Sequence, residues 1–235
     1  IMERKTVLEH LIDLRKALLK ILLFFGICSG VSFIFGKAFI SFLRNDLIPK
    51  EFNITLVLSS PTDFLVAWIN IAIFAGIFLS IPAIIYQTYR FVVPALSQKE
   101  KRFFVYSLIS SVFLFFLGFL FGYFVLLRFT LWFLASLSEP GLLNLWNINS
   151  FLSFAFFLCI TSGLMFTFPI FAVFLSKCEI IDSSILKSNR PYAVVGMFVL
   201  AAIITPPDPF SQIILAVPMM IMYEIAVVLV KLVEK

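Results

Sequence analysis

Four long runs of apolar residues constrain the fold of this chain more than any other feature of its sequence. They cover roughly residues 17–35, 64–86, 103–127 and 151–174. A bilayer core about 30 Å thick needs about 20 apolar residues in helical form, so each run is long enough to cross it. Two shorter runs, joined by the sequence TPPDPFSQ, follow at residues 192–204 and 213–230. The pattern predicts an all-α membrane protein with six transmembrane helices in one domain, residues 1–235.

The composition excludes a water-soluble globular domain. Hydrophobic residues make up 62% of the 235 residues and charged residues only 13%, with a mean hydropathy of +1.09. A soluble domain of this size needs polar residues to cover its outside, whereas the 31 Phe residues suit a surface solvated by lipid. The net charge of +5 does not indicate a nucleic-acid partner, because the cations cluster at the ends of the apolar runs.

The last two apolar runs are shorter than a full span. The fifth run has 13 residues, which form about 20 Å of helix. The sixth reaches Glu224 after 11 apolar residues. We therefore expect a short last hairpin that thins the bilayer around it or tilts its neighbours.

Lys and Arg residues predict the orientation of the spans. Fourteen of the 18 fall at the amino end, in the second and fourth loops and in the carboxyl tail. The other four are Lys37, Arg44, Lys50 and Arg128. Cytoplasmic loops of membrane proteins carry the excess of Lys and Arg, so both termini of this multi-pass chain are expected in the cytoplasm.

The amino end, TVLEHLIDLRKALLK, has the pattern of an amphipathic helix that lies at the membrane interface and leads into the first span. Thr6 and Glu9 have the spacing of a capping box, which marks a helix start. Asp13 is not needed for that cap. It has the spacing of an ion-pair partner for Lys16, and it is also placed to receive a ligand from outside the chain. Both interpretations stay open.

Glu100 lies among cations in the loop PALSQKEKR between the second and third runs. Positive charge alone would orient the loop, so the acid needs its own explanation. Ser97 and Glu100 have the spacing of a second capping box, directly before the third run. A capping carboxylate uses one oxygen and leaves the other available, so helix capping and the binding of a cationic peptide are compatible roles.

Five segments together resemble TatC, the largest core subunit of the twin-arginine protein translocase. They are HLIDLRKAL, YQTYRFVVPAL followed by KEKR, RPYAVVGMFV, TPPDPFSQ and PMMIMYEI. The resemblance implies six spans in a cupped, concave bundle in the inner membrane of a prokaryote. It also implies a subunit without enzymatic activity or cofactor that binds twin-arginine signal peptides. Such a subunit assembles with single-span partners of the TatA and TatB type in an oligomeric complex driven by the proton-motive force.

The signal-peptide contacts of this family can be carried over to matching positions. They are Asp13, Arg15, Phe91, Pro94, Lys99, Glu100, Lys101 and Arg102. Two adjacent arginines present two planar guanidinium groups, each of which matches a carboxylate, so Asp13 and Glu100 are the expected receptors. The surrounding cations would weaken the binding of loosely basic peptides.

Four polar residues in or beside the later spans are further candidates, as contacts for partner helices. Thr167 stands where the family commonly has a glutamate, and we expect it to bond back to the Gly163 carbonyl beside Pro169. Asp208 is expected to cap the sixth span, and Gln212 to bond a polar group on a partner helix. Glu224 is either a functional intramembrane acid or a protonated acid hydrogen-bonded inside the bundle.

Two other classes of function compete with the translocase. A proton-coupled small-molecule transporter would use Glu224 as its relay, but such a protein is expected to show repeat symmetry and further buried ionisable residues. An intramembrane hydrolase needs paired catalytic residues within the spans, whereas His10 lies outside them. The three cysteines share no metal-ligand spacing, so neither a metal site nor a disulfide framework is expected.

Overall fold

The computed structural model of the chain describes residues 7–48, 52, 54–92, 98–137, 143–205 and 208–234. Side chains are described for these residues except within 7–11, 88–92 and 98–102. Pro94 and Ser97 lie outside the described residues.

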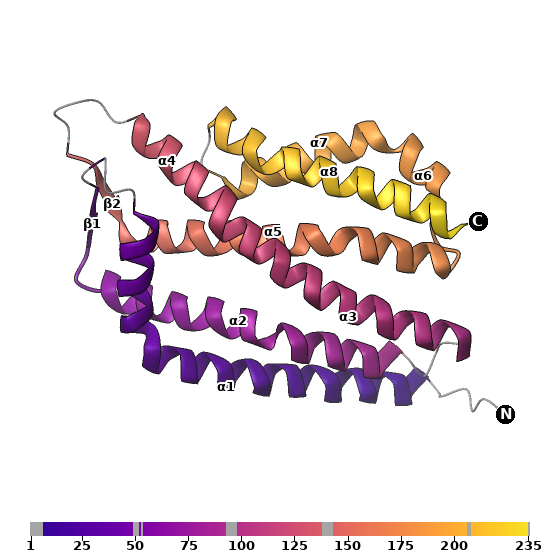
Figure 1. Ribbon diagram of the computed structural model, residues 1–235. Helices are drawn as coiled ribbons and strands as arrows, with labels where there is room; N and C mark the ends of the chain where they lie inside the picture. The colour runs from indigo at the N-terminus through magenta and orange to yellow at the C-terminus, as the bar shows by residue number, and fades with distance from the viewer. Residues whose placement is uncertain are drawn as a thin grey trace.

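Helices make up nearly all of the described chain, and both termini lie at the same end of the bundle (Figure 1). The elements in chain order are α1 (Val7–Leu47), β1 (Thr55–Val57), α2 (Asp63–Val92), α3 (Gln98–Phe121), the π-helical segment η3 (Gly122–Leu127), α4 (Arg128–Ser136), β2 (Leu145–Asn147), α5 (Ile148–Lys177), α6 (Ser183–Ser188), α7 (Arg190–Ile204) and α8 (Pro209–Val233). Five described helical stretches are long and apolar enough to cross a membrane, and α7 is a shorter apolar helix. The predicted class, an all-α membrane protein with about six spans, is confirmed.

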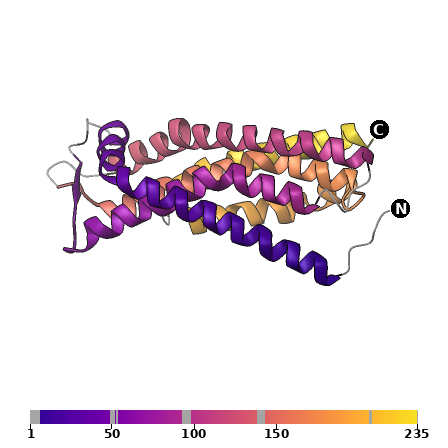
Figure 2. The same ribbon diagram turned by 90° about the horizontal axis from the view of Figure 1, so that it is seen from below.

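The α5 helix is the centre of the bundle. It packs against α3 and α8 and also contacts α2 and α7, while α1 packs mainly against α2 (Figures 1 and 2). Its buried residues are spread along its whole length, from Ile148 to Val173. Because α5 packs apolar side chains against several neighbours, it connects α2 and α3 with α7 and α8.

Small residues bring α3 and α5 close together. A methyl group added at Gly118 would lie 2.7 Å from the Ser162 carbonyl oxygen, and one added at Gly122 would lie 2.9 Å from the Ser162 Cβ. The Ser162 hydroxyl donates to the Gly118 carbonyl at 2.8 Å. Glycines four positions apart allow helix backbones to approach closely where lipid offers no hydrophobic driving force, so packing and this hydrogen bond stabilise the contact.

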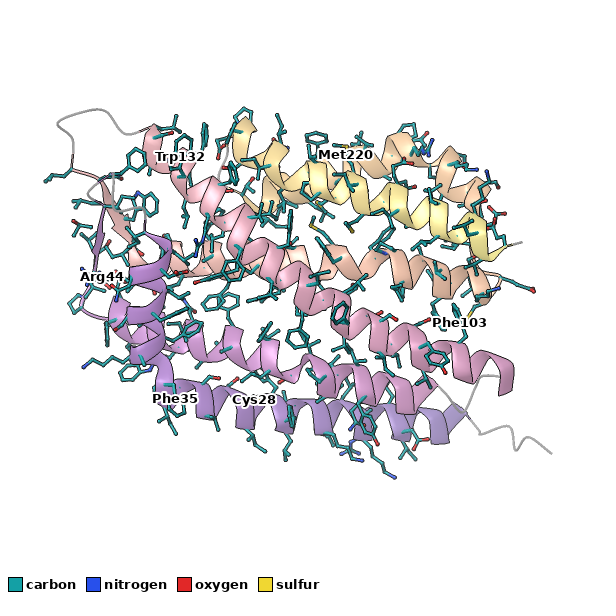
Figure 3. All side chains as sticks on the ribbon, in the orientation of Figure 1. Cys28, Phe35, Arg44, Phe103, Trp132 and Met220 are labelled. Atoms are coloured by element: carbon teal, nitrogen blue, oxygen red, sulfur yellow. The ribbon has the colours of Figure 1, made fainter. Side chains whose placement is uncertain are left out.

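The α1 helix is one continuous helix that bends sharply near Phe35, so that the turns around Arg44 run across the end of the bundle (Figure 3). The Trp68 indole N–H donates to the Phe33 carbonyl at 2.6 Å, an oxygen that a regular helix would pair with Lys37. Gly36 leaves the space that the Trp68 ring occupies. A side chain inserted into the hydrogen-bond ladder explains the bend. The predicted amphipathic segment forms the first turns of α1 and is not a separate helix.

A short parallel ribbon joins two loops at the end opposite the termini, which the sequence did not predict. Thr55 pairs with Leu145 and Val57 with Asn147. The Asp63 carboxylate holds the same loops together, since it accepts from the Ser60 N–H at 3.0 Å and from the Asn147 amide at 3.1 Å.

Of the two helices in the last hairpin, only α7 is short. The α7 helix has 15 residues, about 22 Å of helix, which agrees with the expectation for the fifth span. The α8 helix has 25 residues, about 37 Å, so the prediction of a short sixth span was wrong. Glu224 does not end the helix, because glutamate is a good helix former and the apolar residues 225–230 follow it.

Candidate functional site

The residues proposed to bind a peptide lie at the end of the bundle that carries the termini. The first turns of α1, the last turn of α2 and the first turn of α3 all meet this end (Figure 1). Phe91 is on α2, and Lys99 through Arg102, with Glu100 among them, are on the first turns of α3. Their side chains lie outside the described ones, as does the whole of Pro94. The backbone alone brings Asp13 and Glu100 to the same end.

Asp13 and Arg15 lie on the part of α1 that faces α2. The Asp13 side chain is half-buried and takes part in a polar interaction. Arg15 is exposed and lines a groove of about 510 Å³ between the two helices. The rest of the groove is almost wholly apolar, with Leu18 and Leu22 from α1 and Ser80 and Ile84 from α2 among its walls. The basic Arg15 side chain therefore lies beside an apolar groove.

Thr167 is bonded within its own helix. Its hydroxyl donates to the Leu164 carbonyl at 2.7 Å, so the expected bond to Gly163 was wrong by one residue. A threonine hydroxyl in a helix can reach either the third or the fourth preceding carbonyl, and spacing alone does not decide between them.

Asp208 caps α8 as predicted. Its carboxylate accepts from the Ser211 N–H at 2.7 Å, and Pro209 occupies the first helical position. The second carboxylate oxygen of Asp208 is buried and has no hydrogen-bond partner in the described chain. Gln212 donates to the Phe198 carbonyl of α7 at 2.9 Å, so its amide N–H₂ joins the two helices of the hairpin.

Glu224 forms an ion pair that sequence reasoning missed. The Arg190 guanidinium donates to its carboxylate, and the two side chains are 46% and 51% exposed. Glu224 is therefore half exposed and paired with Arg190, and it is not enclosed within the bundle. A usable signal existed, because Arg190 and Glu224 lie at nearly equal distances along the sequence from the connection between α7 and α8, and an antiparallel hairpin places such residues side by side.

An apolar groove adjoins this ion pair on the outer face of α8. It has a volume of about 450 Å³ and is lined by Met220, Ile221, Glu224, Ile225, Val228 and Leu229. Nearby, the Tyr223 hydroxyl donates to the Leu186 carbonyl and ties α8 to α6. The face therefore combines apolar side chains with one charged pair on a fixed hairpin.

Polar contacts also fix the loop between α5 and α7, at the same end as the termini. The Asp182 carboxylate accepts from the Ile185 N–H at 2.7 Å and from the Ser184 hydroxyl at 2.8 Å. These bonds, the backbone bond first, lower the pKa of Asp182 below its usual value. The Glu234 carboxylate accepts from Ser183, so the carboxyl tail is bonded to this loop.

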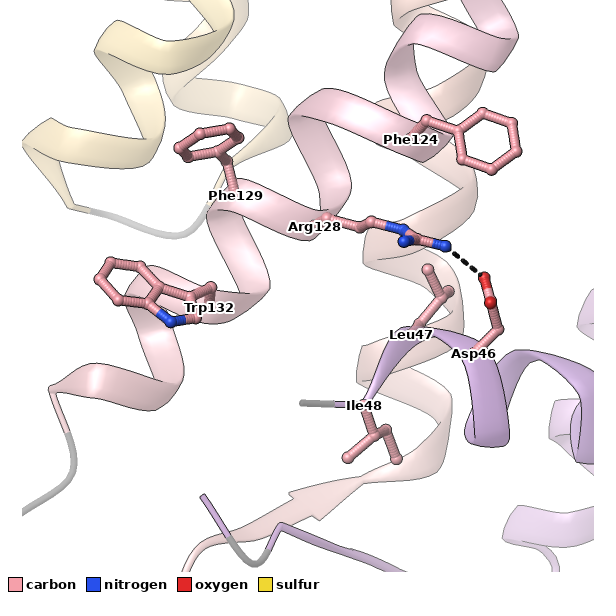
Figure 4. A pocket seen from close by; sticks show the side chains of 7 residues that line it. All are labelled: Asp46, Leu47, Ile48, Phe124, Arg128, Phe129 and Trp132. Carbon is pink, nitrogen blue, oxygen red and sulfur yellow. Dashed lines mark hydrogen bonds and ion pairs between the residues drawn. The ribbon is translucent and has the colours of Figure 1, made fainter. Parts of the chain in front are cut away.

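A second polar group, also missed by sequence reasoning, lies at the opposite end. The Asp46 carboxylate accepts from the Tyr123 hydroxyl at 2.6 Å and from the Arg128 guanidinium at 3.0 Å (Figure 4).

Within the described ranges, no group of three or more His, Cys, Asp and Glu side chains is placed to hold a metal ion.

Comparison with known proteins gives one consistent family. The model of the TatC family, described as Sec-independent protein translocase protein, matches residues 9–218. The chain is similar to the Sec-independent protein translocase protein TatC of Aquifex aeolicus (strain VF5), with 37% identity over 226 residues, 95% of this chain and 94% of the relative. It is also similar to that of Escherichia coli (strain K12), with 33% identity over 226 residues, 96% of this chain and 88% of the relative.

The fold agrees with the sequence comparison. A crystal structure described as the twin arginine translocase receptor TatC matches with a TM-score of 0.87 and 36% sequence identity. The match covers 96% of this chain and 100% of that chain. The likeness therefore extends over almost the whole length of both proteins.

Proposed function

Because the chain belongs to the TatC family of Sec-independent protein translocase proteins, we propose that it is the subunit that binds twin-arginine signal peptides. Membership makes it a multi-pass membrane protein and a transport protein that works with other Tat components. In the proposed role it binds the signal peptides of folded precursors in the inner membrane of a prokaryote. The proton-motive force then drives export through the assembled complex.

The observation that carries the proposal is the placement of the two acidic segments at one end of the bundle. Asp13 is on the first turns of α1, and Glu100 is on the first turn of α3, which follows α2 directly. Because α1 packs along α2, the segments that hold the two acids approach the same region from two sides. Two carboxylates in one region suit two adjacent guanidinium groups.

The cations near Glu100 support discrimination between peptides. Lys99, Lys101 and Arg102 repel basic segments that cannot pair closely with a carboxylate. An arginine side chain forms two parallel hydrogen bonds to a carboxylate, and these bonds offset the repulsion from the three cations. A lysine offers only a single point charge. We therefore propose that twin arginine is preferred over twin lysine at this site.

The decisive test of this function is binding of a twin-arginine signal peptide to the purified protein in detergent at fixed salt. We expect saturable binding, and weak or no binding of the matched peptide in which both arginines are replaced by lysine. Equal affinity for the two peptides would contradict the proposed recognition of guanidinium groups. No binding of either peptide would contradict the receptor role itself.

We further propose that both termini and the loop holding Glu100 face the cytoplasm. The proposal rests on the concentration of Lys and Arg residues on that side. In intact cells, with Cys28 and Cys178 replaced, an impermeant thiol reagent should modify a cysteine introduced at Asn45 or Leu143. It should spare a cysteine at Lys99, and labelling of Lys99 from outside would contradict the orientation.

The outer face of α8 supports a proposal for partner assembly. The groove beside Glu224 is apolar, and a single-span partner helix of the TatA or TatB type fits a surface of this kind. Gln212 and Asp208 lie about three and four turns from Glu224 toward the start of α8, and with Thr167 on α5 they are proposed as further polar contacts. Disulfide crosslinking between a cysteine at Ile221 or Val228 and the partner span should succeed. Crosslinking with equal yield from Ile34, an exposed residue on α1, would contradict this choice of face.

A further inference from the structure

Arg128 is a cation in an unusual setting at the end of the bundle away from the termini. It opens α4 directly after the π-helical segment η3, and its side chain is 45% exposed. Its neighbours on the helix surface are aromatic, since Phe124, Phe129 and Trp132 are also exposed. Trp and Tyr are enriched at the membrane–water interface, and Trp132 and Tyr123 both lie close to Arg128 in the sequence. A guanidinium at that depth is costly unless polar groups satisfy it.

Among the residues that the structure describes, one hydrogen-bond acceptor, Asp46, contacts the Arg128 guanidinium. One nitrogen donates to the Asp46 carboxylate at 3.0 Å, and that same carboxylate oxygen also accepts from the Tyr123 hydroxyl at 2.6 Å. A guanidinium has five N–H donors in a planar fork. The guanidinium carbon lies 5.5 Å from the centroid of the Phe124 ring, which packs against one side of the group. Asp46 and Phe124 therefore fix the direction of the group, and 45% of the Arg128 side chain remains exposed.

The space beside this guanidinium is an apolar pocket of about 540 Å³. Leu47 and Ile48 form one wall, and Phe129 and Trp132 the other (Figure 4). Arg128 and Asp46 stand together at one side of the pocket, so the charged and apolar parts are separate (Figure 4). A ligand that matches this division has an anionic head and an apolar chain.

We propose that this pocket binds one glycerophospholipid, with its phosphodiester on the Arg128 guanidinium and an acyl chain between Ile48 and Trp132. The phosphate oxygens match the planar fork of the guanidinium, and the chain matches the apolar walls. An apolar helix from another protein would cover the walls but leave the guanidinium donors without partners. A free phosphate would pair with the guanidinium but leave the walls exposed.

The test uses a photoreactive phenylalanine analogue at Phe129, in the purified, delipidated protein. Dioleoyl phosphatidylglycerol should be captured by light, and dioleoylglycerol, which lacks the phosphate, should be captured about tenfold less. Glycerol phosphate, which lacks the chains, should not compete. Equal capture of dioleoylglycerol would overturn the phosphate contact, and full competition by glycerol phosphate would reduce the site to an anion site.

Two charge variants complete the test. Arg128→Gln should lower capture of phosphatidylglycerol about tenfold, whereas Arg44→Gln, an exposed cation at the same end outside this pocket, should not. Arg128→Lys keeps the charge without the fork and should capture less than the parent protein, which gives a second reading if Arg128→Gln folds poorly. Unchanged capture in both Arg128 variants, or capture of a second protein chain in place of lipid, would overturn the proposal.

Discussion

Two regions of this protein each carry two glycines four positions apart, and the surroundings of these glycines differ between the regions. In α3 and η3, Gly118 and Gly122 lie against α5, where an added methyl group would collide with the backbone of Ser162 and with Phe166. In α1, Gly26 and Gly30 have no atom within 4 Å of the position that a methyl group would take. The same spacing is therefore a tight contact in one region and an open surface in the other.

The difference reflects what each helix does in the bundle. Of the most apolar 18-residue stretch, 44% is buried within the protein in α5 and none in α1. Burial against protein makes α5 and its contact with α3 the stable scaffold, whereas α1 packs mainly against α2. The helix that begins at the proposed recognition site is thus the one with the least internal packing.

The largest expected effect of this contrast is on stability. Gly118→Ala and Gly122→Ala should each destabilise the protein by about 1–3 kcal/mol, because the backbone of α5 must move to accept the methyl group. Gly30→Ala should be neutral or slightly stabilising, since alanine is the better helix former and the space is open. Thermal unfolding in detergent measures all three. Equal destabilisation by Gly30→Ala would show that α1 is packed as tightly as α3.

A smaller effect is expected at the bend of α1. Trp68→Phe keeps an aromatic ring beside Phe33 but removes the N–H that bonds its carbonyl, at a cost of about 0.5–1.5 kcal/mol. We also expect the bend to open, because the carbonyl returns to the helix ladder. Spin labels at Leu23 and Arg44, on either side of the bend, should move apart. An unchanged distance would assign the bend to packing of the ring alone.

The smallest expected effect is a pH dependence at Asp182. Its pKa is lowered in the folded protein, so its contribution to stability is present above the unfolded value and is lost as the pH falls through the folded value. Asn can cap a helix equally well but carries no charge. Asp182→Asn should therefore differ slightly from the parent protein at neutral pH, and the difference should shrink as the pH falls below about 4, the ordinary pKa of an Asp carboxyl. A difference that persists in acid would contradict this charge effect.

The helices of this fold were predictable because they follow from local composition. Runs of apolar residues located every span, and the Asp208 cap was found from a local pattern of Asp followed by Pro. The extents of the helices were less predictable. The α8 helix runs from Pro209 to Val233, beyond both ends of the predicted span 213–230, and Glu224 within it pairs with Arg190, which is far away in sequence. Long-range pairs of this kind leave no mark in hydropathy.

In the candidate site too, some positions were predictable from the local sequence and others were not. The position of Asp13 on α1 and of Glu100 at the start of α3 followed from helix patterns near each residue. The Asp46, Tyr123 and Arg128 group did not, because its members meet only through the bend of α1 and the π-helical segment before Arg128. Neither irregularity has a sequence signal as strong as an apolar run.

The affinity of the Glu100→Gln variant for a twin-arginine peptide tests the central claim most directly. Glutamine can still cap a helix, so a purely structural role for Glu100 predicts unchanged binding. The receptor role predicts a loss of about 1.5–3 kcal/mol, the usual value for a hydrogen bond to a charged group, or roughly ten- to a hundredfold in affinity. Glu179→Gln, an exposed acid at the same end, is the matched control and should bind as the parent protein does. Parental affinity in Glu100→Gln would contradict the account and leave Glu100 as a helix cap.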